Sequence, residues 1–340
     1  MKIGIQIPHS DPARASVPDL IRRCQLAEKN GFDSLWLEDH VIGGDRSAVV
    51  WLECFALLTV MALNTKKTVL GPIVTDVLRR QPVTLAQTVA SLDRISDGRF
   101  VLGLGAGEAM NLAPFGIEME HLVSRLEEAI KAMKLLWGSS PSRRAEFRGE
   151  HYSLSEAYMQ VRPVQEPHPP IYIGAFGSRM LELTGRLADG WVPTQHSPET
   201  YKATLKVVHG HATRAGRETS SVEPVLCLLG CVRKDGEEAR RRMVDTAKLC
   251  VALFPEIMAA LVPEAKSPGP EFTMVRLREG DWRALYESAK EIPANKALTT
   301  VIAGDVPEVI EQIEDFAEAG VKHLIISLRD SDDDQVVRDF

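Results

Sequence analysis

Residues 17–38 read VPDLIRRCQLAEKNGFDSLWLE and contain one complete helix-to-strand unit. Apolar residues recur at helical spacing over residues 17–30, and residues 34–38 form a short apolar run typical of a strand. Gly31 lies between the two, and glycine ends a helix readily because it adopts left-handed backbone angles at little cost. The stretch therefore predicts a helix that stops directly before a strand.

The same unit recurs along the chain. Apolar runs predict eight strands, at residues 2–8, 34–38, 68–74, 100–104, 170–175, 190–194, 224–232 and 321–328. Helical spacing predicts helices at residues 17–30, 83–95, 122–137 and 178–188. Glycines precede the strands at Gly31, Gly98, Gly190 and Gly320. Strands separated by helices pair in parallel, either in a doubly wound sheet or in a closed barrel. Eight units without an obvious linker favour one α/β domain over residues 1–340, a (β/α)8 TIM barrel.

Two stretches interrupt this rhythm. Residues 139–168 contain a hairpin-like core at 145–152, and residues 262–296 have the pattern of a loop with short helices. Long excursions on a barrel are most often covers of the active site or contacts between subunits. Both are therefore predicted to be insertions into the barrel that decide its substrate specificity.

Composition excludes several classes of protein. The net charge is −7, from 40 Lys and Arg against 47 Asp and Glu, so no binding of nucleic acid is expected. No apolar window is long enough for a membrane span, and residues 1–8 are too interrupted for a signal peptide. Five scattered cysteines are typical of reduced thiols in the cytoplasm, and no nearby histidine completes a metal ligand set with Cys227 and Cys231. A cytoplasmic protein without a metal site is expected.

In a barrel, the functional residues lie where the strands end and the following loops begin. Asp39 and His40 follow the second predicted strand, where they could serve acid–base chemistry. A helix cap with a surface histidine is the alternative. Thr75 and Asp76 follow the third strand, where they either hydrogen-bond a ligand or cap the loop.

The loop after the fourth strand reads GLGAGEAMN, residues 103–111. It lacks the glycine spacing of a dinucleotide-binding loop, and no helix is expected to follow at once. The glycines are predicted to let a large planar ligand approach the backbone, with the Glu108 carboxylate over that ligand. A tight turn with a solvated glutamate is the alternative.

After the fifth strand, a glycine-containing loop from Gly174 to Gly177 leads into a predicted helix. Glycines and free amides at a helix N-terminus form an anion site that suits a phosphate. The alternative is that Ser178 simply caps this helix.

Five segments of the chain resemble the luciferase-like superfamily of flavin and deazaflavin oxidoreductases. They are residues 27–36 with 38–40, residues 70–75, 91–99, 103–111 and 170–175. Segments 70–75 and 91–99 are similar to methylenetetrahydromethanopterin reductase, whereas 107–111 is similar to deazaflavin-dependent glucose-6-phosphate and secondary-alcohol dehydrogenases. Both branches use coenzyme F420, so the resemblance implies this cofactor, with FMN as the alternative.

The resemblance also implies roles for individual residues. His40 and Glu108 would act on a substrate hydroxyl, and Asp39 would face the polar end of the cofactor. A bulge with a non-proline cis peptide, expected at Ile73-Val74, would contact the cofactor ring. The cofactor phosphate would lie against a backbone cradle formed by Gly174, Ala175, Phe176 and Gly177. The other implied cofactor contacts are Thr75, Gly107 and Asn111.

Two departures argue against glucose 6-phosphate as the substrate. The sugar-phosphate enzymes carry a tryptophan shortly after the Asp-His pair, where residues 41–44 of this chain read VIGG. They also carry a phosphate-binding lysine just beyond the sixth strand, where residues 195–197 read QHS.

We therefore predict an F420-dependent oxidoreductase that transfers a hydride between the deazaflavin C5 and the carbon of an alcohol or carbonyl substrate. Three alternatives stay open. They are C–N hydride transfer as in the methanopterin reductases, an FMN-dependent monooxygenase, and a non-enzymatic relative with a degenerate barrel mouth. The family also implies a homodimer that acts on a small molecule.

Overall fold

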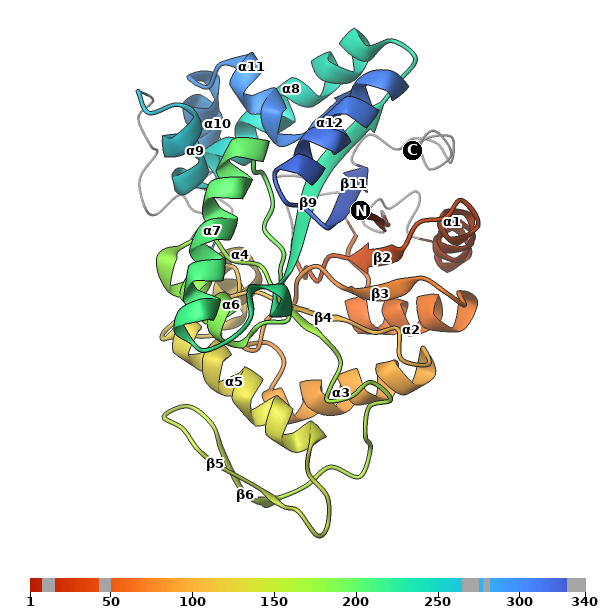
Figure 1. Cartoon of the computed structure of the whole chain (residues 1–340), viewed down its shortest axis with the longest axis vertical. Helices are drawn as coiled ribbons and strands as arrows, with labels where there is room; N and C mark the ends of the chain where they lie inside the picture. Colours follow the sequence, from red (N-terminus) through yellow and green to blue (C-terminus); the bar gives the residue numbers. More distant parts are fainter. Residues whose placement is uncertain (8–15, 43–49, 265–274, 278–281, 329–340) are drawn as a thin grey trace.

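The computed structural model describes residues 1–7, 16–42, 50–264, 275–277 and 282–328. Parallel strands form the centre of the molecule, with helices around them (Figure 1). In the order of their pairing they are β3 (Val69–Pro72), β2 (Ser34–Leu37), β1 (Lys2–Gln6), β11 (His323–Leu328), β9 (Glu223–Val232), β8 (Gly190–Trp191), β7 (Ile171–Ile173) and β4 (Leu102–Leu104). Single bridges join Leu70 to Phe100 and Thr75 to Leu104, and so close β3 against β4. The predicted (β/α)8 barrel is confirmed, with all eight predicted strands present.

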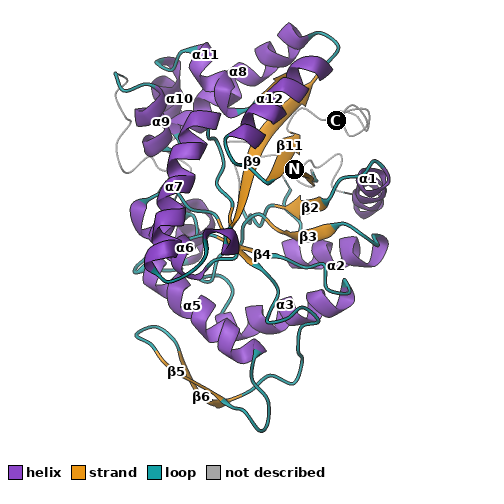
Figure 2. Cartoon of the chain, viewed as in Figure 1, coloured by secondary structure: helices purple, strands orange, loops and turns teal. Residues whose placement is uncertain are grey.

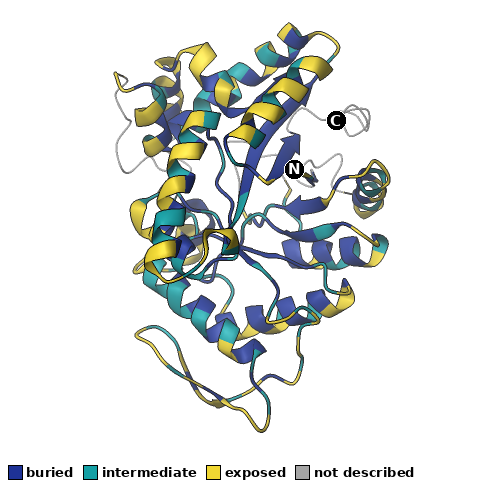
Figure 3. Ribbon diagram, viewed as in Figure 1, coloured by how far each residue is buried: buried dark blue, intermediate teal, exposed yellow. Residues whose placement is uncertain are grey.

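Helices separate the strands and cover the outside of the barrel (Figure 2). The first three are α1 (Val17–Lys29), α2 (Cys54–Asn64) and α3 (Pro82–Ile95). The later ones are α5 (Leu122–Trp137), α6 (Ser178–Leu187), α7 (Pro198–Arg214), α8 (Gly236–Ala252) and α12 (Val306–Glu318). The strands are buried, whereas the outer faces of the helices are largely exposed (Figure 3). The four helices predicted from periodicity, α1, α3, α5 and α6, are confirmed to within one residue at each end.

Three of the four glycines predicted to end helices adopt the left-handed conformation. Gly31, Gly98 and Gly320 have φ angles of 90°, 75° and 107°, which other residues rarely adopt. Gly190 is different, because it lies inside β8 without a positive φ. A Cβ there would lie 2.4 Å from the ring of Tyr172, so close packing requires this glycine and the prediction of a helix stop is wrong.

Side chains fill the interior of the barrel. The rings of Trp36 and Tyr172 stack there with their centroids 6.0 Å apart. At the N-terminal end of the strands, Trp36 Nε1 donates a hydrogen bond to Ser34 Oγ at 2.7 Å, and Lys2 pairs with Glu223 at 2.8 Å. The barrel is therefore a packed core and not a pore, so a ligand is expected at the C-terminal end, where loops follow the strands.

The first predicted excursion forms a hairpin of β5 (Ala145–Arg148) and β6 (Ser153–Ala157), which projects from the barrel (Figure 1). Three backbone N–H groups in the turn between β5 and β6 donate hydrogen bonds to the Glu128 carboxylate of α5. They belong to Glu150, His151 and Tyr152, at 2.8 to 3.0 Å. These bonds hold the hairpin against the outside of α5.

The second excursion follows α9 (Pro255–Leu261) and contains α10 (Trp282–Lys290) and the start of α11 (Ala294–Ala297). Its residues 265–274 and 278–281 lie outside the described residues. The short strand β10 (Ile302–Gly304) follows and pairs in parallel with the end of β9. None of the strands predicted from sequence covers β10. Among the described residues, no helix has the length and apolar character needed to cross a membrane.

Candidate active site at the barrel mouth

Asp39 lies in an ion-pair network where β2 ends. Thr75 Oγ1 donates to its Oδ2 at 2.5 Å, from the loop that follows β3. Arg80 donates to both carboxylate oxygens, at 2.9 and 3.1 Å, and Arg79 Nη2 lies 3.2 Å from Oδ2. Burial acts to raise the pKa of Asp39, but the hydrogen bond from Arg80 and the two guanidinium charges outweigh it and lower the pKa. Asp39 is therefore an anion held by the protein itself, and its contact with a cofactor stays a prediction.

Sequence reasoning missed Arg79 and Arg80 as site residues. Their position in the sequence could have identified them, because two adjacent arginines follow the loop after β3 directly. Arg79 Nε also donates to Asp76 Oδ2 at 2.5 Å. Asp76 Oδ1 accepts from the backbone N–H groups of Leu78 and Arg79, so the loop-capping alternative is confirmed for Asp76.

Asn111 joins His40 to Glu108, and we call these three residues the proton-transfer cluster. The Asn111 Oδ1 atom accepts hydrogen bonds from the backbone N–H groups of Val41 at 2.7 Å and Ile42 at 3.0 Å. This orientation leaves Nδ2 as a donor, 2.8 Å from His40 Nδ1 and 3.1 Å from Glu108 Oε2. His40 Nδ1 is therefore an acceptor, and the neutral ring carries its proton on Nε2.

Glu108 enters this cluster from the loop after β4. Its Oε2 lies 3.4 Å from His40 Nδ1, and 25% of the side chain is exposed. Burial raises the pKa of Glu108 above its ordinary value, against the opposing effect of His40. A carboxyl group with a raised pKa beside an imidazole can exchange a proton with it.

A short helix, α4 (Ala109–Leu112), begins directly after Glu108. The prediction that no helix follows this loop at once is therefore wrong. Gly107, with a φ of 89°, turns the chain immediately before it. The helix places Asn111 one turn after Glu108, where residues three apart face the same side. That turn is why the two side chains meet.

The backbone between β3 and β4 packs closely around Val74. The Ile73-Val74 peptide is cis, as predicted. A Cβ at Gly105 would lie 2.7 Å from Val74 Cγ2, and one at Gly103 would lie 2.1 Å from the carbonyl oxygen of Pro72. These two glycines allow segments of the chain itself to approach each other. Packing of the chain itself accounts for these two glycines, and the approach of a ligand to this loop stays a prediction.

The predicted phosphate cradle lies beside the same valine. A Cβ at Gly174 would come within 3.5 Å of Val74 Cγ2. Helix α6 begins at Ser178 with Gly177 as its N-cap, and no described side chain caps it, so the Ser178 alternative is wrong. The first N–H groups of α6 stay free for an anion, as a phosphate site requires. Glu256 opposes an anion here, since its Oε1 lies 3.9 Å from the Cβ position of Gly177.

The side chain of Phe176 packs against two other aromatic rings. Its ring stacks on Phe254 with centroids 4.2 Å apart and lies parallel to His196 at 5.9 Å. Burial lowers the pKa of His196 to about 3, so this ring is neutral. Gln195, buried next to it, has a φ of 58°. This position beyond β8 therefore carries two uncharged side chains, where the sugar-phosphate enzymes carry a lysine.

Comparison with known proteins agrees with this fold and site. Residues 1–323 match the family described as luciferase-like monooxygenase. The chain belongs to the luciferase-like monooxygenase family. The predicted luciferase-like barrel and the predicted oxidoreductase class are thereby confirmed.

Several similar proteins use coenzyme F420. One relative of this luciferase-like chain is an F420-dependent glucose-6-phosphate dehydrogenase from Nakamurella multipartita, 31% identical over 312 residues that cover 88% of this chain and 83% of the relative. A 5,10-methylenetetrahydromethanopterin reductase from Archaeoglobus fulgidus is 28% identical over 304 residues, which cover 88% of this chain and 86% of the relative. A solved F420-dependent secondary alcohol dehydrogenase, in complex with an F420-acetone adduct, shares the fold with a TM-score of 0.83 at 24% identity, covering 100% of this chain and 96% of that one. The predicted resemblance to both F420-dependent branches is confirmed.

Proposed function

We propose that this luciferase-like enzyme transfers a hydride between coenzyme F420 and the carbon of a small alcohol or carbonyl substrate. The observation that carries the proposal is the proton-transfer cluster of His40, Asn111 and Glu108. When a hydride moves to or from a carbon that bears oxygen, a proton must move to or from that oxygen. The names of two similar dehydrogenases support the same class of reaction.

The cluster provides a route for this proton. Among the described groups, none hydrogen-bonds to Nε2 of His40, so this N–H can donate to the substrate oxygen while Nδ1 faces Glu108. In the reduction of a carbonyl, the Nε2 proton moves to the oxygen as the hydride reaches the carbon, and Nδ1 exchanges its hydrogen bond from Asn111 for the proton of Glu108. The ring stays neutral and Glu108 becomes a carboxylate. Oxidation of an alcohol runs the same steps in reverse.

The described residues fit a deazaflavin at the barrel mouth. When bound, the cofactor supplies the two-electron hydride carrier. The free N–H groups at the start of α6 would hold its phosphate, and the cis Ile73-Val74 peptide would support its ring. The remaining contacts in the proposal are Asp39, Thr75, Gly107 and Asn111. FMN is the rival cofactor, because it carries a phosphate that the same N–H groups would bind.

Fluorescence titration with each cofactor tests this choice. We expect the deazaflavin to bind with a dissociation constant of about 1 μM or below. Tight binding of FMN with no response to the deazaflavin contradicts the proposal.

C–N hydride transfer is the second candidate, because the methanopterin reductase is also similar over most of its length. In that reaction no substrate oxygen needs a proton, and the Glu108 carboxylate would stabilise positive charge on the substrate. The pH profile of hydride transfer separates the two candidates. An alcohol or carbonyl enzyme should lose a rate factor of about 10²–10⁴ in His40→Asn, together with the pH-dependent limb. A flat profile in both proteins, with little loss of rate, favours the pterin substrate.

We also propose that the enzyme is a cytoplasmic homodimer. Helix α2 is apolar on all sides, with the sequence CFALLTVMALN, and its Leu63 is 66% exposed. An outer helix of this kind usually packs against another surface. All five cysteines are described and none forms a disulfide bond, a pattern typical of a reducing compartment.

A further inference from the structure

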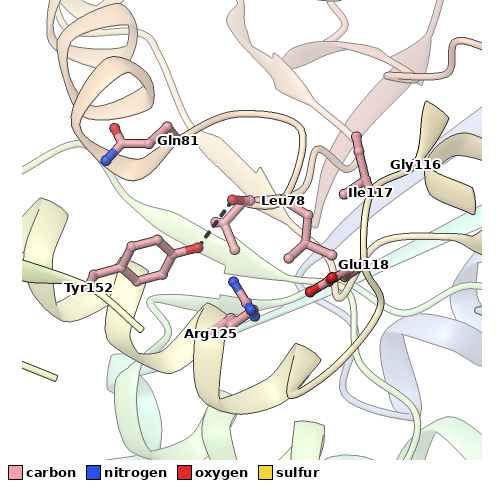
Figure 4. Close-up of a pocket in the computed structure, with 8 residues that line it drawn as sticks. Leu78, Gln81, Gly116, Ile117, Glu118, Arg125 and Tyr152 are labelled. Carbon is pink, nitrogen blue, oxygen red and sulfur yellow. Dashed lines mark hydrogen bonds between the residues drawn. The ribbon is translucent and has the colours of Figure 1, made fainter. Parts of the chain in front are cut away.

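A pocket lies on the outer rim of the barrel, between the loops after β3 and β4, the start of α5 and the β5–β6 hairpin (Figure 4). Its volume is about 370 Å³, within the range of small-molecule sites. Val77, Leu78 and Ile117 form an apolar wall. None of the pocket's residues belongs to the proton-transfer cluster or to the phosphate cradle.

Three polar groups from three segments converge on this pocket. Figure 4 shows the Arg125 guanidinium, the Glu118 carboxylate and the Tyr152 hydroxyl turned toward the space beside Leu78. Tyr152 donates a long hydrogen bond of 3.4 Å to the carbonyl oxygen of Val77. A hydroxyl held this loosely can exchange its partner for a ligand atom.

Arg125 keeps most of its hydrogen-bonding capacity. Its Nε donates to the backbone carbonyl of Glu120 at 3.1 Å, and its guanidinium also interacts with Tyr152. Within the described part of the chain, no ion pair joins Arg125 or Glu118 to another side chain. Because arginine has five N–H donors, others remain after these two contacts and can donate to a ligand carboxylate.

The opposite charges on the two sides of the pocket select the ligand. A simple anion would be attracted by Arg125 but repelled by Glu118. A simple cation would be attracted by Glu118 but repelled by Arg125. A molecule with both a carboxylate and an ammonium group satisfies both side chains. We propose that this pocket binds a small zwitterion, an α-amino acid whose apolar side chain packs on Leu78 and Ile117.

Isothermal titration with L-leucine and two matched analogues tests the proposal on the full-length protein. 4-Methylpentanoate lacks the ammonium group, and isoamylamine lacks the carboxylate. We expect leucine to bind with a dissociation constant on the order of 1 mM, and each analogue about tenfold more weakly. No binding of leucine, or equal binding of either analogue, overturns the proposal.

Two variants test whether leucine binds in this pocket. Arg125→Gln and Glu118→Gln should each weaken leucine binding about tenfold, because each removes one charge partner. Glu120→Gln is the matched control, since its exposed side chain does not line the pocket, and it should bind as wild type does. Thermal unfolding of each variant checks that the fold is kept. Leucine binding that survives both Arg125→Gln and Glu118→Gln contradicts the assignment of this pocket.

Discussion

The amide nitrogen of Asn111 lies 2.8 Å from Nδ1 of His40, and this contact decides which ring nitrogen carries the proton. The amide cannot be turned around without cost, because its oxygen already accepts the backbone N–H groups of Val41 and Ile42. We therefore expect ring-nitrogen NMR spectroscopy to show neutral His40 protonated at Nε2. In Asn111→Leu the donor is lost, and a mixture of both forms should appear. Protonation at Nδ1 in the wild-type protein contradicts the proposed route for the proton.

Glu108→Gln should change stability in a pH-dependent way. Burial raises the pKa of Glu108 in the folded chain above its ordinary value of 4.5. At a pH below 4.5, protonated Glu108 contributes its full stabilisation of the fold. This stabilisation is lost as the pH rises through the raised pKa of the folded state. Glutamine cannot ionise, so the variant should unfold at a higher temperature than wild type at neutral pH and at about the same temperature in acid. Glu120→Gln, at an exposed position, should match wild type throughout. An equal gain at both pH values contradicts the explanation.

Arg80→Gln should destabilise the protein at neutral pH by about 1–3 kcal/mol, because it removes charged hydrogen bonds from the buried Asp39 carboxylate. The folded pKa of Asp39 is lowered, so this contribution is present above its ordinary value of 3.8 and is lost as the pH falls through the folded pKa. Urea unfolding should therefore show that the loss in free energy of unfolding caused by Arg80→Gln is smaller in acid than at neutral pH. Arg148→Gln, at an exposed position of β5, is the control and should cost little.

Gly177→Asp should weaken deazaflavin binding by about tenfold or more, because it places a negative charge beside the phosphate and beside Glu256. Gly177→Ala is the matched control. Its φ of −64° suits alanine, and the nearest atom to the new methyl group is 3.9 Å away. Fluorescence quenching measures both affinities. If the two variants bind the cofactor equally well, the phosphate lies elsewhere.

Leu63→Asp should convert the proposed dimer into a monomer, because it places a charge on the exposed side of the apolar helix α2. Sedimentation velocity measures the oligomeric state. Leu135→Asp on α5, where the leucine is 41% exposed, is the control and should leave the dimer intact. A monomeric wild-type protein rules out the dimer.

The barrel was predictable because its signals are local. The unit at residues 17–38 contains a helical period, a glycine stop and an apolar run, and each of these acts over a few residues. The short elements β10 and α4 were not predicted. They form where longer neighbours position the backbone, as β9 does for β10.

The candidate site was predictable only in part. Sequence placed His40 and Glu108 at strand ends and attributed the glycines at 103 and 105 to a ligand, but it did not predict that they accommodate Pro72 and Val74. The partners of Asp39 were missed for a related reason. Arg79 and Arg80 lie 40 and 41 residues further along the chain, and local spacing carries no signal for such a pair.

Sequence by itself determined the eight strands, four of the helices between them and the polar residues that stand where the strands end. Only the tertiary structure decided how those residues meet. His40 and Asn111 are 71 residues apart, and their contact depends on the relative position of two loops to within a few tenths of an ångström. Patterns of apolar spacing specify which face of a strand or helix is buried. They do not specify the direction of a hydrogen bond between two loops, because that direction is set only when the whole barrel has closed.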